Sequence, residues 1–174
     1  SHRVLKEDGV LAFTYHHSRS EGWKSVMEAI MAAGFVITAA HPIKAEMAVA
    51  MPKHQAKEPI DLDVIMVCRK KAARTGHRSI SGAWPRAAVV ATRQILRLRN
   101  AARTLSRNDV RVVIMSQRVR ELSFFPSIRT ALDTLDDNQG EVESVIDTLW
   151  DTTPGNASRA SSVSRSSTAD FAPR

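Results

Sequence analysis

The fold is decided by residues 9–71, GVLAFTYHHSRSEGWKSVMEAIMAAGFVITAAHPIKAEMAVAMPKHQAKEPIDLDVIMVCRKK. Residues 9–15 form an apolar run that is too short for a helix and rich in β-forming side chains, which predicts a buried strand. A helix should follow, because apolar residues recur at the spacing of one helix face: Trp23, Val26, Met27, Ile30 and Met31. Two further apolar runs, residues 35–40 and 62–68, are also predicted to be strands.

The predicted helix has a start signal and a stop signal. Ser18 and Glu21 have the spacing of a capping box, in which a hydroxyl and a carboxylate satisfy free N–H groups of the first turn. Gly34 should end the helix, because glycine adopts the left-handed conformation without steric cost. Strand, helix, strand, long loop and strand, in this order, indicate the closing half of an α/β sheet.

Three ordered segments carry a resemblance to a known family: LKEDGVLAFTYHH at 5–17, GWKSVMEAIMAAGFVITAAHPIKAEM at 22–47 and VIMVCRKK at 64–71. Together they resemble the C-terminal part of prokaryotic adenine-specific DNA methylases, which are class I S-adenosylmethionine-dependent methyltransferases. LSRNDVRVVIM at 105–115 resembles the helical segment of the same methylases more loosely. The resemblance implies that the three strands are the fifth, sixth and seventh of a Rossmann-like sheet. The last strand would lie antiparallel between the other two.

Two motifs of this family are missing from the sequence. Class I methyltransferases hold S-adenosylmethionine on a Gly-rich turn, and the chain has no Gly-X-Gly; their catalytic motif contains consecutive prolines, and the chain has no Pro-Pro. We therefore expect no catalytic residue and no cofactor-binding residue here. A missing N-terminal half, or a complementing subunit, would supply both. Ser1 in place of Met and a strand predicted from residue 9 also indicate a fragment.

Candidate substrate-binding residues follow the ends of the first two predicted strands. Ligands bind beyond the carboxyl ends of strands in doubly wound sheets, and the resemblance places His16 and His17 near the target adenine. The alternative is a structural role, in which hydrogen bonds of the two imidazoles hold the turn before the helix. Alternation puts Thr14 and His16 on one side of the strand, with Tyr15 and His17 on the other. Glu46 is a further candidate by resemblance, and its alternative is a solvated loop carboxylate.

The charge of the chain is divided into a basic block and an acidic block. Residues 69–120 carry 14 basic and one acidic side chain, whereas residues 121–151 carry one basic and eight acidic side chains. A concentrated positive block favours polyanions, which makes Arg93, Arg97 and Arg103 candidates for binding DNA phosphates. The alternative is that these arginines form the solvated face of a helix that pairs with the acidic block.

The third predicted strand is followed by a helical region. We divide the chain into a methyltransferase part at 1–71, a linker at 72–83, a helical segment at 84–151 and a Ser/Arg-rich tail at 152–174, which we expect to be disordered. Within the helical segment, apolar residues form a continuous stripe: Ala88, Ala91, Ile95, Leu98, Ala102 and Leu105.

A second helix of the helical segment is predicted at 109–122, with Ser106 or Asn108 as its N-cap. Residues 110–115 could also form a strand, because they are apolar without interruption. Two short helices are predicted at 126–135 and 141–150.

The sequence thus predicts the C-terminal part of a DNA adenine methyltransferase that does not methylate DNA alone. One alternative is a non-catalytic nucleic-acid-binding or accessory module with a basic helical arm, and another is a truncated remnant without a function.

We expect no membrane partner, because no apolar stretch approaches the ~20 residues that span a bilayer. No metal site is expected, because adjacent histidines point in different directions. The single cysteine, Cys68, should be packed in a strand, which favours a reducing compartment, the cytoplasm.

Overall fold

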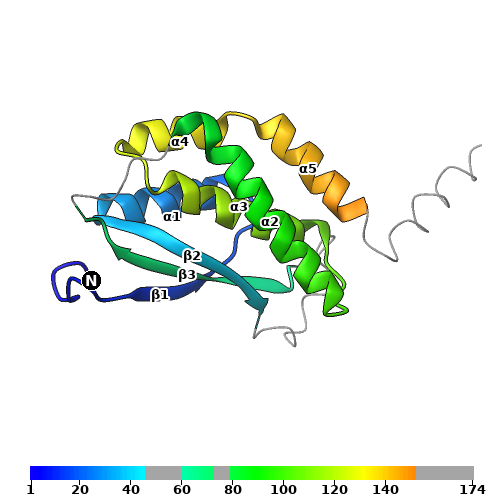
Figure 1. Ribbon diagram of the computed structural model, residues 1–174, viewed down its shortest axis with the longest axis horizontal. Coiled ribbons are helices and arrows are strands. Elements are labelled where there is room, and N and C mark those ends of the chain that lie inside the picture. The colour runs from blue at the N-terminus through cyan, green and yellow to red at the C-terminus, as the bar shows by residue number, and fades with distance from the viewer. Residues whose placement is uncertain (46–59, 73–78, 152–174) are drawn as a thin grey trace, which may run out of the picture.

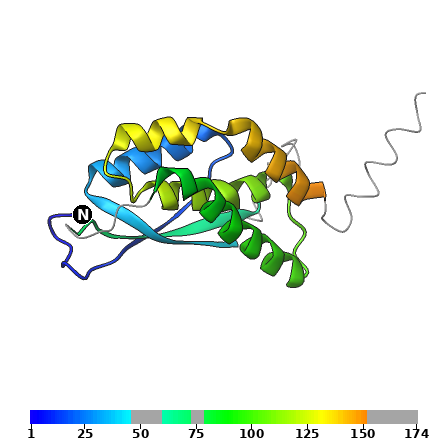
Figure 2. The ribbon, with the colours of Figure 1, turned by 45° about the horizontal axis from the view of Figure 1, so that its top comes forward.

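The computed structural model describes residues 1–45, 60–72 and 79–151, which fold into a mixed α/β structure (Figure 1). Within these residues a three-stranded sheet is combined with five α-helices. The helices lie on one face of the sheet, as the two views in Figures 1 and 2 both show. Glu46 and the tail at 152–174 lie outside the described residues.

The three strands have the order that the resemblance predicts. They are β1 (Leu11–Tyr15), β2 (Phe35–Lys44) and β3 (Leu62–Lys70), and β3 lies between the other two. Because β3 is antiparallel to both neighbours, β1 and β2 are parallel to each other and end on the same side of the sheet. β2 is longer than predicted and continues through Pro42, since an edge strand tolerates a residue without an N–H.

The first helix, α1 (Ser20–Ala32), has the predicted apolar face but a different start. Trp23, Met27 and Ile30 are buried. The predicted capping box is wrong: the N-cap is Arg19, which makes no side-chain capping hydrogen bond. The prediction for Gly34 is confirmed, because this residue has φ +80° directly after the helix.

The remaining helices are α2 (Ala83–Asn100), α3 (Arg107–Leu122), α4 (Ile128–Asp136) and α5 (Gln139–Asp151), with a short 3₁₀ turn, η2 (Ile80–Gly82), before α2. The strand alternative for residues 110–115 is wrong, because they lie in the middle of α3. Ser106 is the N-cap and forms a capping box with Asp109. α2 ends at Asn100, before the end of its predicted stripe, and a left-handed Ala102 follows it; its buried residues are Ala83, Ala87, Ala91 and Ile95.

α3 is the centre of the packing. It is buried on nearly all sides, because it lies between the sheet and the other helices (Figures 1 and 2). Its apolar residues belong to the same hydrophobic cluster as residues of the sheet and of α1, among them Trp23, Met66 and Ile114. The cluster therefore continues across the predicted boundary between 1–71 and 84–151.

The two faces of β3 differ. Leu62, Val64, Met66 and Cys68 are buried beneath the helices, whereas the side chains that alternate with them are partly exposed on the face that no described helix covers. Each central position of β3 therefore either packs into the core or faces away from the helices.

The Cys68 thiol should be inert in the folded chain. Its side chain is 0% exposed, and burial raises its pKa to about 11, so that almost no thiolate is present at neutral pH. We expect no reaction of the native protein with a dithiobis-nitrobenzoate reagent and full reaction in guanidinium. Rapid modification of the native protein would show that the sheet–helix interface opens.

Candidate functional site

His16 and Asp63 meet where β1 ends and β3 begins. The antiparallel register pairs Tyr15 with Val64, so the residue after Tyr15 lies beside the residue before Val64, on the uncovered face. His16 Nδ1 hydrogen-bonds to Asp63 Oδ1, and the His16 side chain is about half exposed (48%). His16 Nε2 has no hydrogen-bond partner among the described residues. When Asp63 accepts the Nδ1 proton, Nε2 of a neutral imidazole is an acceptor that faces outward.

His17 lies in the turn that leads into α1. The Arg19 N–H donates to His17 Nδ1 at 3.0 Å, and Trp23 Nε1 donates to the His17 carbonyl at 2.9 Å. The His17 ring lies against Gly22, where an added Cβ would come within 2.3 Å of His17 Cγ. The structure thus separates the two predicted histidines, because His16 faces outward while His17 holds the start of the helix. Tyr15 also lies on the helix side, against Trp23.

A basic cleft, which is the second feature of the site, lies along the outer edge of β2. Its volume is ≈ 320 Å³, and β2, α2 and α3 line it through Thr38, Ala39, Ala40, His41, Val90, Arg93, Gln94, Arg97, Gln117 and Arg120. No carboxylate is among these residues. Arg93 and Arg97 are exposed and make no ion pair with a described residue. The third predicted arginine, Arg103, is exposed beyond the end of α2 and does not line the cleft.

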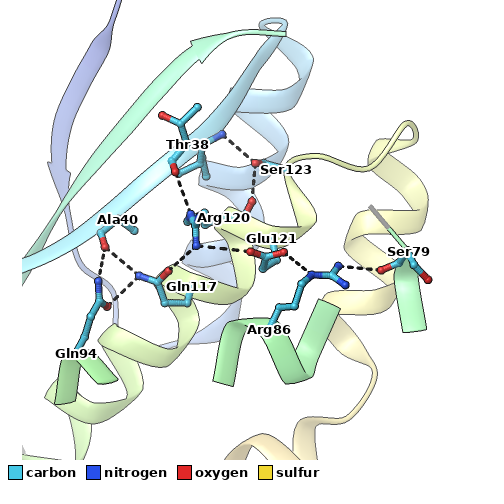
Figure 3. Close-up of polar contacts among 10 residues, drawn as sticks. Thr38, Ala40, Ser79, Arg86, Gln94, Gln117, Arg120, Glu121 and Ser123 are labelled. Atoms are coloured by element: carbon cyan, nitrogen blue, oxygen red, sulfur yellow. Dashed lines mark hydrogen bonds and ion pairs between the residues drawn. The ribbon is translucent and has the colours of Figure 1, made fainter. Parts of the chain in front are cut away.

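A network of side-chain hydrogen bonds forms the floor of the basic cleft (Figure 3). Gln94 Nε2 and Gln117 Nε2 both donate to the Ala40 carbonyl, at 2.8 and 2.9 Å, and Gln117 Nε2 also donates to Gln94 Oε1. Arg120 Nε donates to the Thr38 carbonyl at 3.0 Å. These contacts fix the edge of β2 to α2 and α3.

Other arginines of the basic block are paired with the acidic block. Arg107 pairs with Glu143 and Asp147, and Arg111 pairs with the same Glu143 oxygen at 2.7 Å. Arg86 pairs with the buried Glu121 at 3.0 Å and also donates to the Ser79 carbonyl (Figure 3). The predicted alternative, pairing with the acidic block, therefore describes these arginines, and Arg120 of the cleft also lies 3.5 Å from Glu121. Arg93 and Arg97 form no ion pair with a described residue.

Trp84 and Arg118 are among the residues that line a second cleft, of ≈ 330 Å³. Burial lowers the pKa of Arg118 to about 10, and the guanidinium donates to the carbonyls of Thr134 and Asp137 near the end of α4. Cations at the C-terminus of a helix offset its dipole, so Arg118 has a structural partner already. Asp137 and Glu141 add negative charge to this cleft.

The two edge strands of the sheet differ in the hydrogen bonds that their backbones receive from helix side chains. On β2, the Ile37 N–H donates to Ser123 Oγ at 2.9 Å, and helix side chains also contact the Thr38 and Ala40 carbonyls (Figure 3). On β1, no described residue other than those of β3 hydrogen-bonds to the backbone of Leu11–Tyr15. The outer edge of β1 thus has no hydrogen-bonded neighbour among the described residues.

The site contains residues that the sequence analysis did not single out, namely Asp63, His41, Arg120, Gln94 and Gln117. For Asp63 a signal was present: it is the only charged residue among the apolar residues 62–68, and alternation places it opposite Leu62 and Val64. The other four residues carry no such signal, because their proximity depends on how α2 and α3 cross β2.

The structure and the comparisons add three further findings. No group of three or more His, Cys, Asp or Glu side chains with the geometry of a metal site occurs in residues 1–45, 60–72 and 79–151. None of the helices in these ranges has the length and apolar character needed to cross a bilayer. Comparison with protein-family models, with curated proteins and with solved structures found no match for this chain.

Proposed function

We propose that this chain is the C-terminal part of a DNA adenine methyltransferase, which transfers a methyl group from S-adenosylmethionine to adenine. The observation that carries the proposal is the strand order, with β3 antiparallel between the parallel strands β1 and β2. This is the arrangement that the family resemblance implies for the last three strands of the sheet. The unpaired edge of β1 would then receive the strand that precedes it in the complete domain.

The residues present do not fit S-adenosylmethionine. The cofactor carries a sulfonium cation, and the basic cleft presents Arg93, Arg97 and Arg120 without a carboxylate. The sequence also lacks the Gly-rich turn that lets backbone approach the cofactor. We therefore assign the cofactor and the catalytic motif to strands that join the edge of β1, and we derive no chemical step through them.

In this proposal, His16 is the residue of the chain that faces the substrate. It follows the carboxyl end of β1, where ligands of doubly wound sheets bind. Asp63 fixes the ring through Nδ1, so Nε2 is held outward as an acceptor for an N–H group of a base. His17 would act indirectly, by holding the turn that positions His16.

Two measurements test the proposal. Titration calorimetry of S-adenosylmethionine into this chain alone should give no binding, and tight binding would contradict the assignment of the cofactor to other strands. Addition of the polypeptide encoded directly upstream should give transfer of tritiated methyl groups to DNA adenine. If the two polypeptides together transfer no methyl group, the methyltransferase proposal is wrong.

The role of His16 is tested in the same assay. His16→Ala should lower the turnover number about tenfold, which corresponds to the loss of one hydrogen bond to a charged or polar partner. Glu28→Ala, an exposed residue of α1, is the matched control and should leave turnover unchanged. An unchanged turnover number for His16→Ala would show that His16 makes no such hydrogen bond to the substrate.

A second candidate function is favoured by the basic cleft, independently of methyl transfer. A nucleic-acid-binding module would also place unpaired arginines beside a cleft without carboxylates. The methyltransferase proposal and this candidate share a nucleic-acid partner, and they differ in whether methyl transfer occurs with the upstream polypeptide.

A further inference from the structure

We infer that the basic cleft along β2 binds the phosphate backbone of a nucleic acid, with Arg93 and Arg97 contacting successive phosphates and Arg120 at the floor. The inference rests on the nucleic-acid part of the proposed function. It assigns this contact to the outer edge of β2, together with α2 and α3, and separates it from the His16 side of the sheet.

The first argument is uncompensated charge. Arg93 and Arg97 are one helical turn apart, so their side chains extend from the same face of α2. Both are exposed, and neither forms an ion pair with a described residue. By contrast, Arg107 and Arg111 share Glu143, so the described part of the fold neutralises these two arginines and not Arg93 and Arg97.

A purely structural role, compensation of the helix dipole, explains the positive charge of only one of these two arginines. Arg97 lies in the last turn of α2, where a cation offsets the negative end of the helix dipole. Arg93 lies a turn earlier, where the dipole effect has fallen off, and no carboxylate lines the cleft beside it. The dipole therefore does not account for the pair.

The second argument is the fixed position of Arg120. Its side chain is only 21% exposed, and its guanidinium donates to the Thr38 carbonyl and to Gln117 Oε1. Glu121 lies 3.5 Å from this guanidinium but also pairs with Arg86, so two cations share one carboxylate. The floor thus keeps a net positive charge, and Arg120 does not have to be ordered when an anion binds.

The third argument distinguishes a polymer from a small anion. The exposed basic residues continue past the cleft, from Arg93 and Arg97 along α2 to Arg103 beyond its end. A free phosphate or nucleotide would use the cleft alone. A nucleic-acid strand carries one phosphate charge per nucleotide and would also reach Arg103, which gives a larger salt dependence.

The test is fluorescence anisotropy with fluorescein-labelled oligonucleotides, one single-stranded and one duplex, titrated with the full chain over a salt series. The double variant R93Q/R97Q keeps polar side chains with good helix propensity but removes two charges. Its Kd should rise at least tenfold. The slope of log K against log salt should become shallower by about 1.4 for a single strand or 1.8 for a duplex. The matched control is R129Q, which changes an arginine of α4 that is 85% exposed.

Each outcome supports or overturns the inference. Unchanged Kd and slope in R93Q/R97Q would overturn the cleft assignment, whereas a wild-type chain that binds neither oligonucleotide would overturn the nucleic-acid function itself. Displacement of the oligonucleotides by equimolar pyrophosphate would identify a small-anion site and overturn the polymer assignment. If the double variant melts early by circular dichroism, R93Q and R97Q are measured singly, and each must lower the slope by about 0.7 to 0.9.

Discussion

Asp109→Ala should lower the free energy of unfolding by about 3 kcal/mol, because several backbone N–H groups lose their acceptor at once. Asp109 Oδ1 accepts from the N–H groups of Asp61 and Leu62 at 2.8 and 3.0 Å, and Oδ2 accepts from the Ser106 N–H at 2.9 Å. The carboxylate thus caps α3 and also fixes the first residues of β3. Urea denaturation followed by circular dichroism at the helix band measures the loss.

Graded substitutions separate the role of the Asp109 acceptor from that of its charge. Burial raises the pKa of this carboxyl group, while the hydrogen bonds from Ser106 and Asp61 act in the opposite direction. Asp109→Asn keeps one oxygen for the start of β3 and should therefore lose less stability than Asp109→Ala. Asp133→Ala is the control: its carboxylate is 62% exposed and forms a surface ion pair with Arg129, so a change within about 0.5 kcal/mol is expected. Equal losses for Asp109→Ala and the control would contradict the cap.

Trp23→Ala should lower the free energy of unfolding by about 4 kcal/mol, the usual cost of deleting a buried aromatic side chain. The Trp23 side chain is 0% exposed, and its ring packs edge-on against Tyr15 with centroids 5.1 Å apart. Its indole N–H donates to the His17 carbonyl, so the substitution should also loosen the turn that carries His16 and His17. Denaturant unfolding measures the first effect, and the chemical shifts of the two imidazoles measure the second.

Trp23→Phe distinguishes packing from the hydrogen bond. Phenylalanine keeps most of the buried ring but has no N–H, so we expect a smaller loss of stability together with a similar change in the turn. A Trp23→Phe protein with unchanged imidazole shifts would mean that packing alone holds the turn.

The sequence predicted the elements whose signals are local. The apolar spacing of α1, the left-handed Gly34 and the three apolar runs each depend on neighbours within one turn or one strand. The position of β3 came from the resemblance, because nothing local in residues 62–68 says which strand they join. The start of α1 was predicted wrongly, because the helix begins one residue later with Arg19 as its N-cap, and the Arg19 N–H donates to the imidazole of His17.

The candidate site could be predicted only in part, for a related reason. The arginines of α2 were visible as a charge block, but which of them lack a partner depends on where the acidic residues of α5 pack. Likewise, His16 was visible at the end of a strand, whereas its contact with Asp63 depends on the pairing register across 47 residues. Long-range register and helix crossing are set by the core, and a single sequence does not encode them in any short pattern.

The unequal edges of the sheet limit how copies of this chain can associate. A protein with two free strand edges can add molecules at both ends and grow into fibres. Here side chains of α3 and the following residue hydrogen-bond to Ile37, Thr38 and Ala40 of β2, so within the described residues β1 is the edge that is open to a further strand. Edge-to-edge association would therefore stop at a pair, and a heterologous partner on β1 would compete with that self-association.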